Sequence, residues 1–178
     1  MPLSLSDVHT RAKRVRLLLL DVDGVLTDGT VHVADAGGEA KTFFIRDGLG
    51  IVWARADHMK VGILSGRPSA ATARRAEELH LDLVVQGGPD KARSFAELMA
   101  ARDFQDDEVA YMGDDLLDLP IIRRVGLSAA PADAVADVRS RVHWVSQHAG
   151  GRGAVREFIE VILQGRGTWD RVLQQFLS

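Results

Sequence analysis

The sequence contains no cysteine and no long apolar run. The lack of cysteine excludes disulfide bonds and thiolate metal sites, and no stretch reaches the roughly 18 apolar residues that a membrane-spanning helix needs. Basic residues (22 Lys and Arg) nearly balance acidic ones (25 Asp and Glu), and the net charge is −3. The chain therefore has no general attraction to nucleic acid or to an anionic membrane. We expect one cytoplasmic domain spanning residues 1–178.

The N-terminal stretch MPLSLSDVHTRAKRVR is locally basic, so it could bind nucleic acid although the whole chain is not basic. No apolar signal-peptide core precedes its cluster of Arg11, Lys13, Arg14 and Arg16. We interpret the cluster as a solvated approach to the first strand, rather than as a nucleic-acid-binding patch.

Short apolar runs alternate with amphipathic segments along the chain. The runs are typical of strands buried on both faces and lie at 16–22, 60–64, 81–85, 109–112, 126–129 and 143–145. Helical patterns occur at 48–57, 69–79, 91–102, 116–125, 132–139 and 153–163, with a short amphipathic helix after Thr168. This alternation predicts an α/β fold with a central parallel sheet flanked by helices. Residues 30–33 and 41–45, around the turn-rich ADAGGEA, are predicted to form an inserted β-hairpin.

Two acidic clusters follow predicted strands. Asp21 and Asp23 come directly after LLLL, and GDDLLD places Asp114, Asp115 and Asp118 after the strand at 109–112. Ligands of parallel sheets collect outside the carboxyl ends of the strands, so both clusters meet at one edge if the two strands are neighbours. Carboxylates so close repel one another unless a cation lies between them, and an all-oxygen set favours Mg²⁺. Helix capping explains one of Asp114 and Asp115 but not the first pair, so we favour the metal site.

Two further residues suit an anionic ligand. Ser65 stands at the end of the strand at 60–64 and opens the tripeptide SGR, and a hydroxyl with backbone N–H groups before a helix suits phosphate. Lys91 opens a helix after QGGPD and offers a point charge to a phosphoryl oxygen or a carboxylate. Each signal is weak alone, but each follows its own strand in a fixed order.

With DVDGV, Ser65, Lys91 and GDDLLD together, the sequence resembles the haloacid dehalogenase superfamily of phosphohydrolases. The resemblance implies a Rossmann-like fold in which Asp21 is the nucleophile that forms an aspartyl-phosphate. It makes Asp23 the general acid and then the base that activates water. Ser65 and Lys91 would hold the phosphoryl group.

The same resemblance implies a Mg²⁺ site and no large domain that covers the active site. The metal ligands would be the Asp21 carboxylate, the Asp23 backbone carbonyl and the Asp114 carboxylate, with Asp115 and Asp118 in support. Only the hairpin and one helix separate Asp23 from Ser65, so no large cap domain is expected and the site should be open. Open sites in this superfamily act on large substrates or are closed by oligomerisation.

The full motif set is similar to a branch of the superfamily that dephosphorylates eight-carbon sugar acids on the way to lipopolysaccharide. The matching stretches are DVDGVLTDG, RDGLGI, SGR, QGGPDK, GDDLLD and AGGRGAVRE. This likeness implies a phosphorylated sugar acid as substrate and a homotetramer, in which a neighbour's hairpin and C-terminal tail, residues 164–178, help to close each site. The substrate-binding positions that match are Asp23, Arg46, Asp47, Gly48, Arg67, Arg75 and Lys91.

Other functions stay open at this point. Val52 stands where relatives often carry a basic residue, and Phe44 where a polar one is common, so a nine-carbon sugar-acid phosphate is an alternative substrate. A non-catalytic oligomeric binding domain on the same fold is a second alternative. A receiver domain disagrees with the motif order, and a phosphomutase would require a larger cap.

Overall fold

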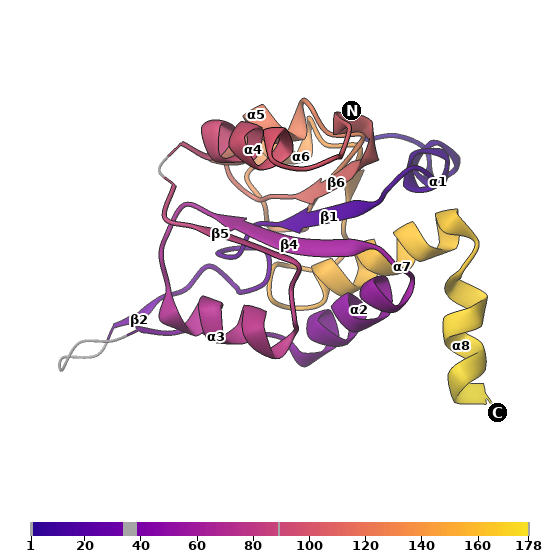
Figure 1. Cartoon of the computed structure of the whole chain (residues 1–178), viewed down its shortest axis with the longest axis horizontal. Helices are drawn as coiled ribbons and strands as arrows, with labels where there is room; N and C mark the ends of the chain where they lie inside the picture. Colours follow the sequence, from indigo (N-terminus) through magenta and orange to yellow (C-terminus); the bar gives the residue numbers. More distant parts are fainter. Residues whose placement is uncertain (1, 34–38, 89, 178) are drawn as a thin grey trace.

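A computed structural model describes residues 2–33, 39–88 and 90–177. Its centre is a six-stranded sheet in the order β5-β4-β1-β6-β7-β8, in which every pairing is parallel (Figure 1). The strands are β1 (Leu17–Leu20), β4 (Lys60–Ser65), β5 (Leu83–Gln86), β6 (Val109–Met112), β7 (Leu127–Ala130) and β8 (Trp144–Val145). The predicted α/β fold with a parallel sheet is confirmed.

Helices cover both faces of the sheet (Figure 1). One layer contains α4 (Lys91–Ala100), α5 (Leu119–Ile122) and α6 (Ala136–Arg139). The other contains α2 (Ile45–Ala56), α3 (Ala70–Glu78) and α7 (Ala154–Arg166), with α1 (Leu5–Ala12) and α8 (Trp169–Leu177) beside it. Two short 3₁₀ helices, η1 (Asp106–Glu108) and η2 (Leu116–Asp118), flank β6. No helix in the described ranges is both long and apolar enough to cross a membrane.

The strand β1 fixes the position of the loop that contains Asp21 and Asp23. Its four leucines are fully buried, with Leu18 and Leu20 in one hydrophobic cluster and Leu17 and Leu19 in the other. Burying a leucine side chain contributes roughly 1.5–3 kcal/mol, and side chains of a strand alternate between the two faces of a sheet. Since β4 and β6 pair with β1 on either side, the residues after Leu20 are held at the middle of the sheet edge.

The N-terminal segment differs from the sequence prediction. The segment before β1 is not only a solvated lead-in, because residues 5–12 form α1, capped by Ser4, whose hydroxyl accepts from the Asp7 amide. Val8 and Ala12 are buried on its inner face, against α7. The four basic residues are exposed. Three of them pair within the chain: Arg11 with the Gly126 carbonyl, Arg14 with Asp107 and Arg16 with Glu108. The cluster is therefore surface charge that is mostly paired.

The hairpin is present but shorter than predicted. Its strands are β2 (His32–Val33) and β3 (Glu39–Ala40), paired antiparallel with His32 opposite Ala40. The connecting residues 34–38 lie outside the described residues. The predicted second strand at 41–45 is wrong, because α2 begins at Ile45 and its first turn contains Arg46, Asp47 and Gly48. The described residues between β1 and β5 contain no element besides this hairpin, α2, β4 and α3, which agrees with the prediction of no large cap.

The C-terminal tail packs on its own chain. Gly167, with a φ of 71°, ends α7 in a left-handed turn, and α8 then packs against α7 and contacts α2. The Trp53 ring lies 5.5 Å from Trp169 and 5.9 Å from Phe176, and Arg171 pairs with Asp57 at 3.1 Å. Contact of this tail with a neighbouring subunit stays a prediction.

Candidate active site

A cleft of about 340 Å³ lies at the carboxyl ends of β1, β4 and β6. It is lined by Asp21, Asp23, Gly29, Ser65, Gly66, Arg67, Lys91, Asp114, Asp115 and Leu117. The parallel order β4-β1-β6 brings the loops after these three strands to the same edge. The structure thus assembles the predicted catalytic and metal-binding residues from four separate parts of the chain.

Asp21 is held rigidly at the bottom of the cleft. It is 6 % exposed, its Oδ1 accepts from the Val22 amide at 2.7 Å, and its Oδ2 accepts from Lys91 Nζ at 2.6 Å. Burial, followed by repulsion from Asp118, raises the pKa of Asp21 to about 6, and the positive charge of Lys91 opposes this rise. Two fixed hydrogen bonds leave this carboxylate oriented without any ligand present.

Lys91 and Asp118 form a buried network next to Asp21. Lys91 Nζ donates to Asp118 Oδ1 at 2.7 Å, and the Tyr111 hydroxyl donates to the same oxygen at 2.6 Å. Asp118 is fully buried, and its Oδ2 accepts from the amides of Asp114 at 2.9 Å and Asp115 at 3.1 Å. Although burial alone lowers the pKa of Lys91, the two carboxylates raise it above its usual value, so the lysine stays charged.

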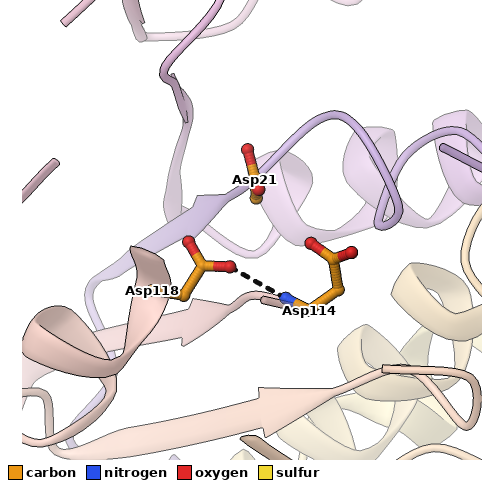
Figure 2. Close-up of side chains that lie close together, drawn as sticks. All are labelled: Asp21, Asp114 and Asp118. Atoms are coloured by element: carbon orange, nitrogen blue, oxygen red, sulfur yellow. Dashed lines mark hydrogen bonds between the residues drawn. The ribbon is translucent and has the colours of Figure 1, made fainter. Parts of the chain in front are cut away.

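The GDDLLD motif distributes three roles that the sequence left unresolved. Asp115 caps η2, because its side chain accepts from the Leu116 amide at 2.7 Å, which confirms that one of the adjacent aspartates is a cap. Asp118 is the residue that binds Lys91 and orders the loop. Asp114 projects towards Asp21 (Figure 2). The sequence signal for Asp118 was only its place four residues after Asp114, a spacing that many solvated helix starts share.

The acidic cluster suits a divalent cation. Oxygens of Asp21, Asp114 and Asp118 all lie within 4.8 Å of one another (Figure 2). Both Asp118 oxygens already accept two hydrogen bonds, whereas no hydrogen bond to the Asp114 carboxylate occurs in the described parts of the chain. Burial, then repulsion from Asp21 and Asp118, raises the pKa of Asp114 to about 7. Lys91 offsets only part of the repulsion among these three carboxylates, so the oxygen-only set fits Mg²⁺. The candidate ligands are Asp114, whose carboxylate accepts no hydrogen bond among the described residues, and Asp21.

Gly24 keeps the space that this cluster needs. Its φ is +83°, and a Cβ there would collide with the Asp114 carboxylate. A left-handed backbone without a side chain therefore lets the loop after β1 approach the loop after β6. The glycine of DVDGV is required by this close approach.

Asp23 has a partner that sequence reasoning missed. Its side chain is 24 % exposed, and its Oδ1 accepts from Lys41 Nζ at 2.5 Å. Lys41 follows β3 of the hairpin, and in the sequence it looks like any solvated lysine beside a strand. Ser65 is 4 % exposed, and its hydroxyl accepts from the Arg67 amide at 3.3 Å. Asp23 and Ser65 both line the cleft, as predicted.

Comparisons with known proteins agree with this geometry. A family model described as haloacid dehalogenase-like hydrolase matches residues 63–159. A protein of Escherichia coli K12, 3-deoxy-D-manno-octulosonate 8-phosphate phosphatase KdsC, is 40 % identical over 96 % of this chain and 90 % of its own. The chain belongs to the haloacid dehalogenase-like hydrolases. The predictions of this family and of a phosphatase-type enzyme are confirmed.

Solved structures of this hydrolase family share the whole fold. A 3-deoxy-D-manno-octulosonate 8-phosphate phosphatase from Yersinia pestis is 41 % identical, with a TM-score of 0.90, over 92 % of this chain and 89 % of that chain. The same enzyme from Moraxella catarrhalis, in complex with a magnesium ion, a phosphate ion and KDO, is 33 % identical, with a TM-score of 0.93. That match covers 96 % of this chain and 98 % of the other.

Four of the predicted substrate residues of this hydrolase lie outside the cleft. Arg46 is exposed and borders a shallow depression beside His148. Asp47, Gly48 and Arg75 border a separate apolar pocket, where the Arg75 guanidinium lies 6.0 Å from the Phe43 ring centre and pairs with Glu78. Within one subunit they do not meet Asp21, so their contact with substrate stays a prediction.

Asp47 is the unusual member of that group. It is 1 % exposed, its Oδ1 accepts from the Arg156 amide at 2.8 Å, and its Oδ2 has no hydrogen-bond partner among the described residues. Burial raises its pKa to about 6, although the amides of Arg156 and Gly153 favour the carboxylate. The hydrogen bond joins the start of α2 to the start of α7.

Proposed function

We propose that this hydrolase is a Mg²⁺-dependent phosphatase that converts 3-deoxy-D-manno-octulosonate 8-phosphate to KDO and phosphate, in the cytoplasmic supply of KDO for lipopolysaccharide. The observation that carries the proposal is the Asp21 carboxylate, fixed by Lys91 and the Val22 amide in an acidic cleft. The relatives named for this activity, at 40 % identity over nearly the whole chain, support the substrate.

The proposed reaction proceeds in two displacements on the same phosphorus. The Asp21 carboxylate attacks the phosphorus and forms an aspartyl-phosphate, while Asp23 gives its proton to the leaving sugar oxygen. Asp23 then takes a proton from water, which attacks the phosphorus, releases phosphate and restores the Asp21 carboxylate. Each step needs an in-line arrangement, which a rigid β1 loop favours.

The other cleft residues offset charge. Lys91 and the Ser65 hydroxyl lie on the cleft wall with Asp21 and suit the phosphoryl oxygens. Mg²⁺, held by the Asp21 and Asp114 carboxylates and the Asp23 backbone carbonyl, would neutralise phosphoryl charge and so let Asp21 approach. Arg67 borders the cleft with a half-exposed side chain and would pair with the carboxylate of the sugar acid.

We also propose that the enzyme works as a homotetramer. The cleft is open, and the described residues contain no cap to exclude water. Val33 on the hairpin and Ile45 at the start of α2 are 82 % and 77 % exposed, which suits burial against other subunits. In such an assembly Arg46, Asp47, Gly48, Arg75 and the tail would lie next to a neighbour's cleft and border its substrate.

Phosphate release from a panel of phosphorylated sugars and sugar acids, with and without Mg²⁺, tests the function. Asp21→Asn should abolish turnover with the fold intact. Asp28→Asn is the matched control, because Asp28 lies on the same loop but pairs with Arg152 at 3.5 Å. Preference for the phosphate of the eight-carbon acid supports the proposal. Preference for the phosphate of a nine-carbon acid, consistent with Val52 and Phe44, would keep the reaction and assign a different substrate. Absence of Mg²⁺-dependent turnover on every substrate would favour the alternative of a non-catalytic binding domain.

A further inference from the structure

The inserted hairpin reaches into the active site through Lys41. The Lys41 side chain is fully buried, and its ammonium donates to Asp23 Oδ1 at 2.5 Å. A second carboxylate, Glu39 Oε1, lies 3.6 Å from the same nitrogen. A buried ammonium is costly unless anions surround it, so this position of Lys41 depends on Asp23 and Glu39.

Glu39 extends the network to the loop after β4. Its Oε2 accepts from Arg67 Nη2 at 2.5 Å, and Arg67 stands in the loop after β4. A continuous series of charge pairs, Asp23–Lys41–Glu39–Arg67, therefore joins the β1 loop, the hairpin and the β4 loop. Two of its members, Asp23 and Arg67, line the cleft, whereas Lys41 and Glu39 do not.

We propose that Lys41 is a positioning residue for the acid–base step, so that the hairpin serves the chemistry as well as assembly. This inference rests on the proposed function. The ammonium holds Oδ1 of Asp23 and fixes the rotation of the carboxyl group, which leaves Oδ2 for the proton exchanged with the substrate. A charge-assisted hydrogen bond of this kind is directional and about twice as strong as a neutral one.

The proton balance defines what Lys41 must affect. As Asp21 forms its bond to phosphorus, the bond from phosphorus to the sugar oxygen breaks, and the proton on Asp23 Oδ2 moves to that oxygen. Lys41 keeps its own proton and stabilises the negative charge left on Asp23. An alkoxide leaving group needs this proton, whereas 4-nitrophenolate leaves without one, so in the step that forms the aspartyl-phosphate only the sugar phosphate depends on a well-oriented Asp23. Hydrolysis of the aspartyl-phosphate uses Asp23 as base with either substrate, so the two substrates differ in the first step alone.

Single-turnover and steady-state kinetics of Lys41→Met test the proposal with two substrates, KDO 8-phosphate and 4-nitrophenyl phosphate. We expect the single-turnover rate of leaving-group release to fall about 10- to 100-fold for the sugar phosphate and less than about 3-fold for the aryl phosphate. Lys60→Met is the matched control, because Lys60 pairs with Asp82 at 2.7 Å on the exposed opposite end of β4. It should leave both rates unchanged. Lys41→Gln, which keeps a neutral donor, gives the same comparison if Lys41→Met does not fold.

Equal losses in the single-turnover release of both leaving groups, or no loss for either, would overturn the positioning role. Equal losses would mean that Lys41 only supports the fold or the assembly, and thermal melting and size-exclusion chromatography of the same variants would show it. Wild-type turnover and Asp23→Asn report on the proposed function itself. A wild type without turnover therefore refutes that function, and an active wild type with an unselective Lys41→Met refutes only the present inference.

Discussion

Replacing Asp118 by asparagine removes the negative charge at the centre of the buried hydrogen-bond network, while the side chain keeps nearly the same size and shape. Four donors converge on the carboxylate, two on each oxygen: Lys91 and Tyr111 on Oδ1, and two backbone amides on Oδ2. An asparagine amide has one acceptor oxygen, so its NH₂ group must face one of these donor pairs. The variant therefore leaves buried donors unpaired and takes one counterion from Lys91.

The expected loss combines two opposing effects. Breaking a buried ion pair on one side costs about 3–5 kcal/mol. Loss of the Asp118 charge also relieves its repulsion of Asp21 and Asp114, which offsets part of this cost. We expect a net loss of about 2 kcal/mol without metal. With Mg²⁺ bound the repulsion is already neutralised, so the loss should rise to about 4 kcal/mol.

Urea unfolding followed by far-UV circular dichroism, in EDTA and in saturating Mg²⁺, measures both values. Asp137→Asn is the control, because Asp137 is exposed and its pair with Arg141 at 2.7 Å is worth only about 0.5 kcal/mol. If Asp118→Asn is as stable as the control under both conditions, the four hydrogen bonds to Asp118 do not stabilise the fold. If the loss of stability is smaller in Mg²⁺ than in EDTA, repulsion between Asp118 and the other two carboxylates is not the opposing effect.

Two further predictions concern single residues. Since the pKa of Asp47 is raised from 3.8 to about 6, the folded state holds its proton more tightly, and this group makes stability fall as pH rises from about 4 to above 6. The Asp47→Asn variant should therefore be more stable than the wild type by up to about 3 kcal/mol of unfolding free energy at pH 7.5, and by little at pH 4. Urea unfolding across this pH range measures the difference, and an equal gain at both pH values would contradict the raised pKa of Asp47 as its cause. Gly24→Ala should lower Mg²⁺ affinity at least about 10-fold by calorimetry, because its Cβ meets Asp114; unchanged affinity would argue against Asp114 as a ligand.

The sequence by itself determined the strands of the sheet and most residues of the candidate site, because both depend on local patterns. Continuous apolar runs such as Leu17–Leu20 form strands buried on both faces, and parallel strands place the residues after them at one edge. Asp21, Ser65 and Asp114 are therefore predicted at that edge, and the strand order β4-β1-β6, which brings them together, comes from the structure. Lys91 was predictable for the same reason, since it opens the helix after β5.

Only the tertiary structure decided which side chains pair across the chain. Asp118 and Asp115 look alike in sequence, but burial against Tyr111 makes one the partner of Lys91 and leaves the other as a cap. Lys41 becomes a buried partner of Asp23 only because the hairpin folds over the β1 loop. Hydrogen bonds and charge pairs act over a few ångströms, and sequence spacing fixes such distances within an element but not between elements.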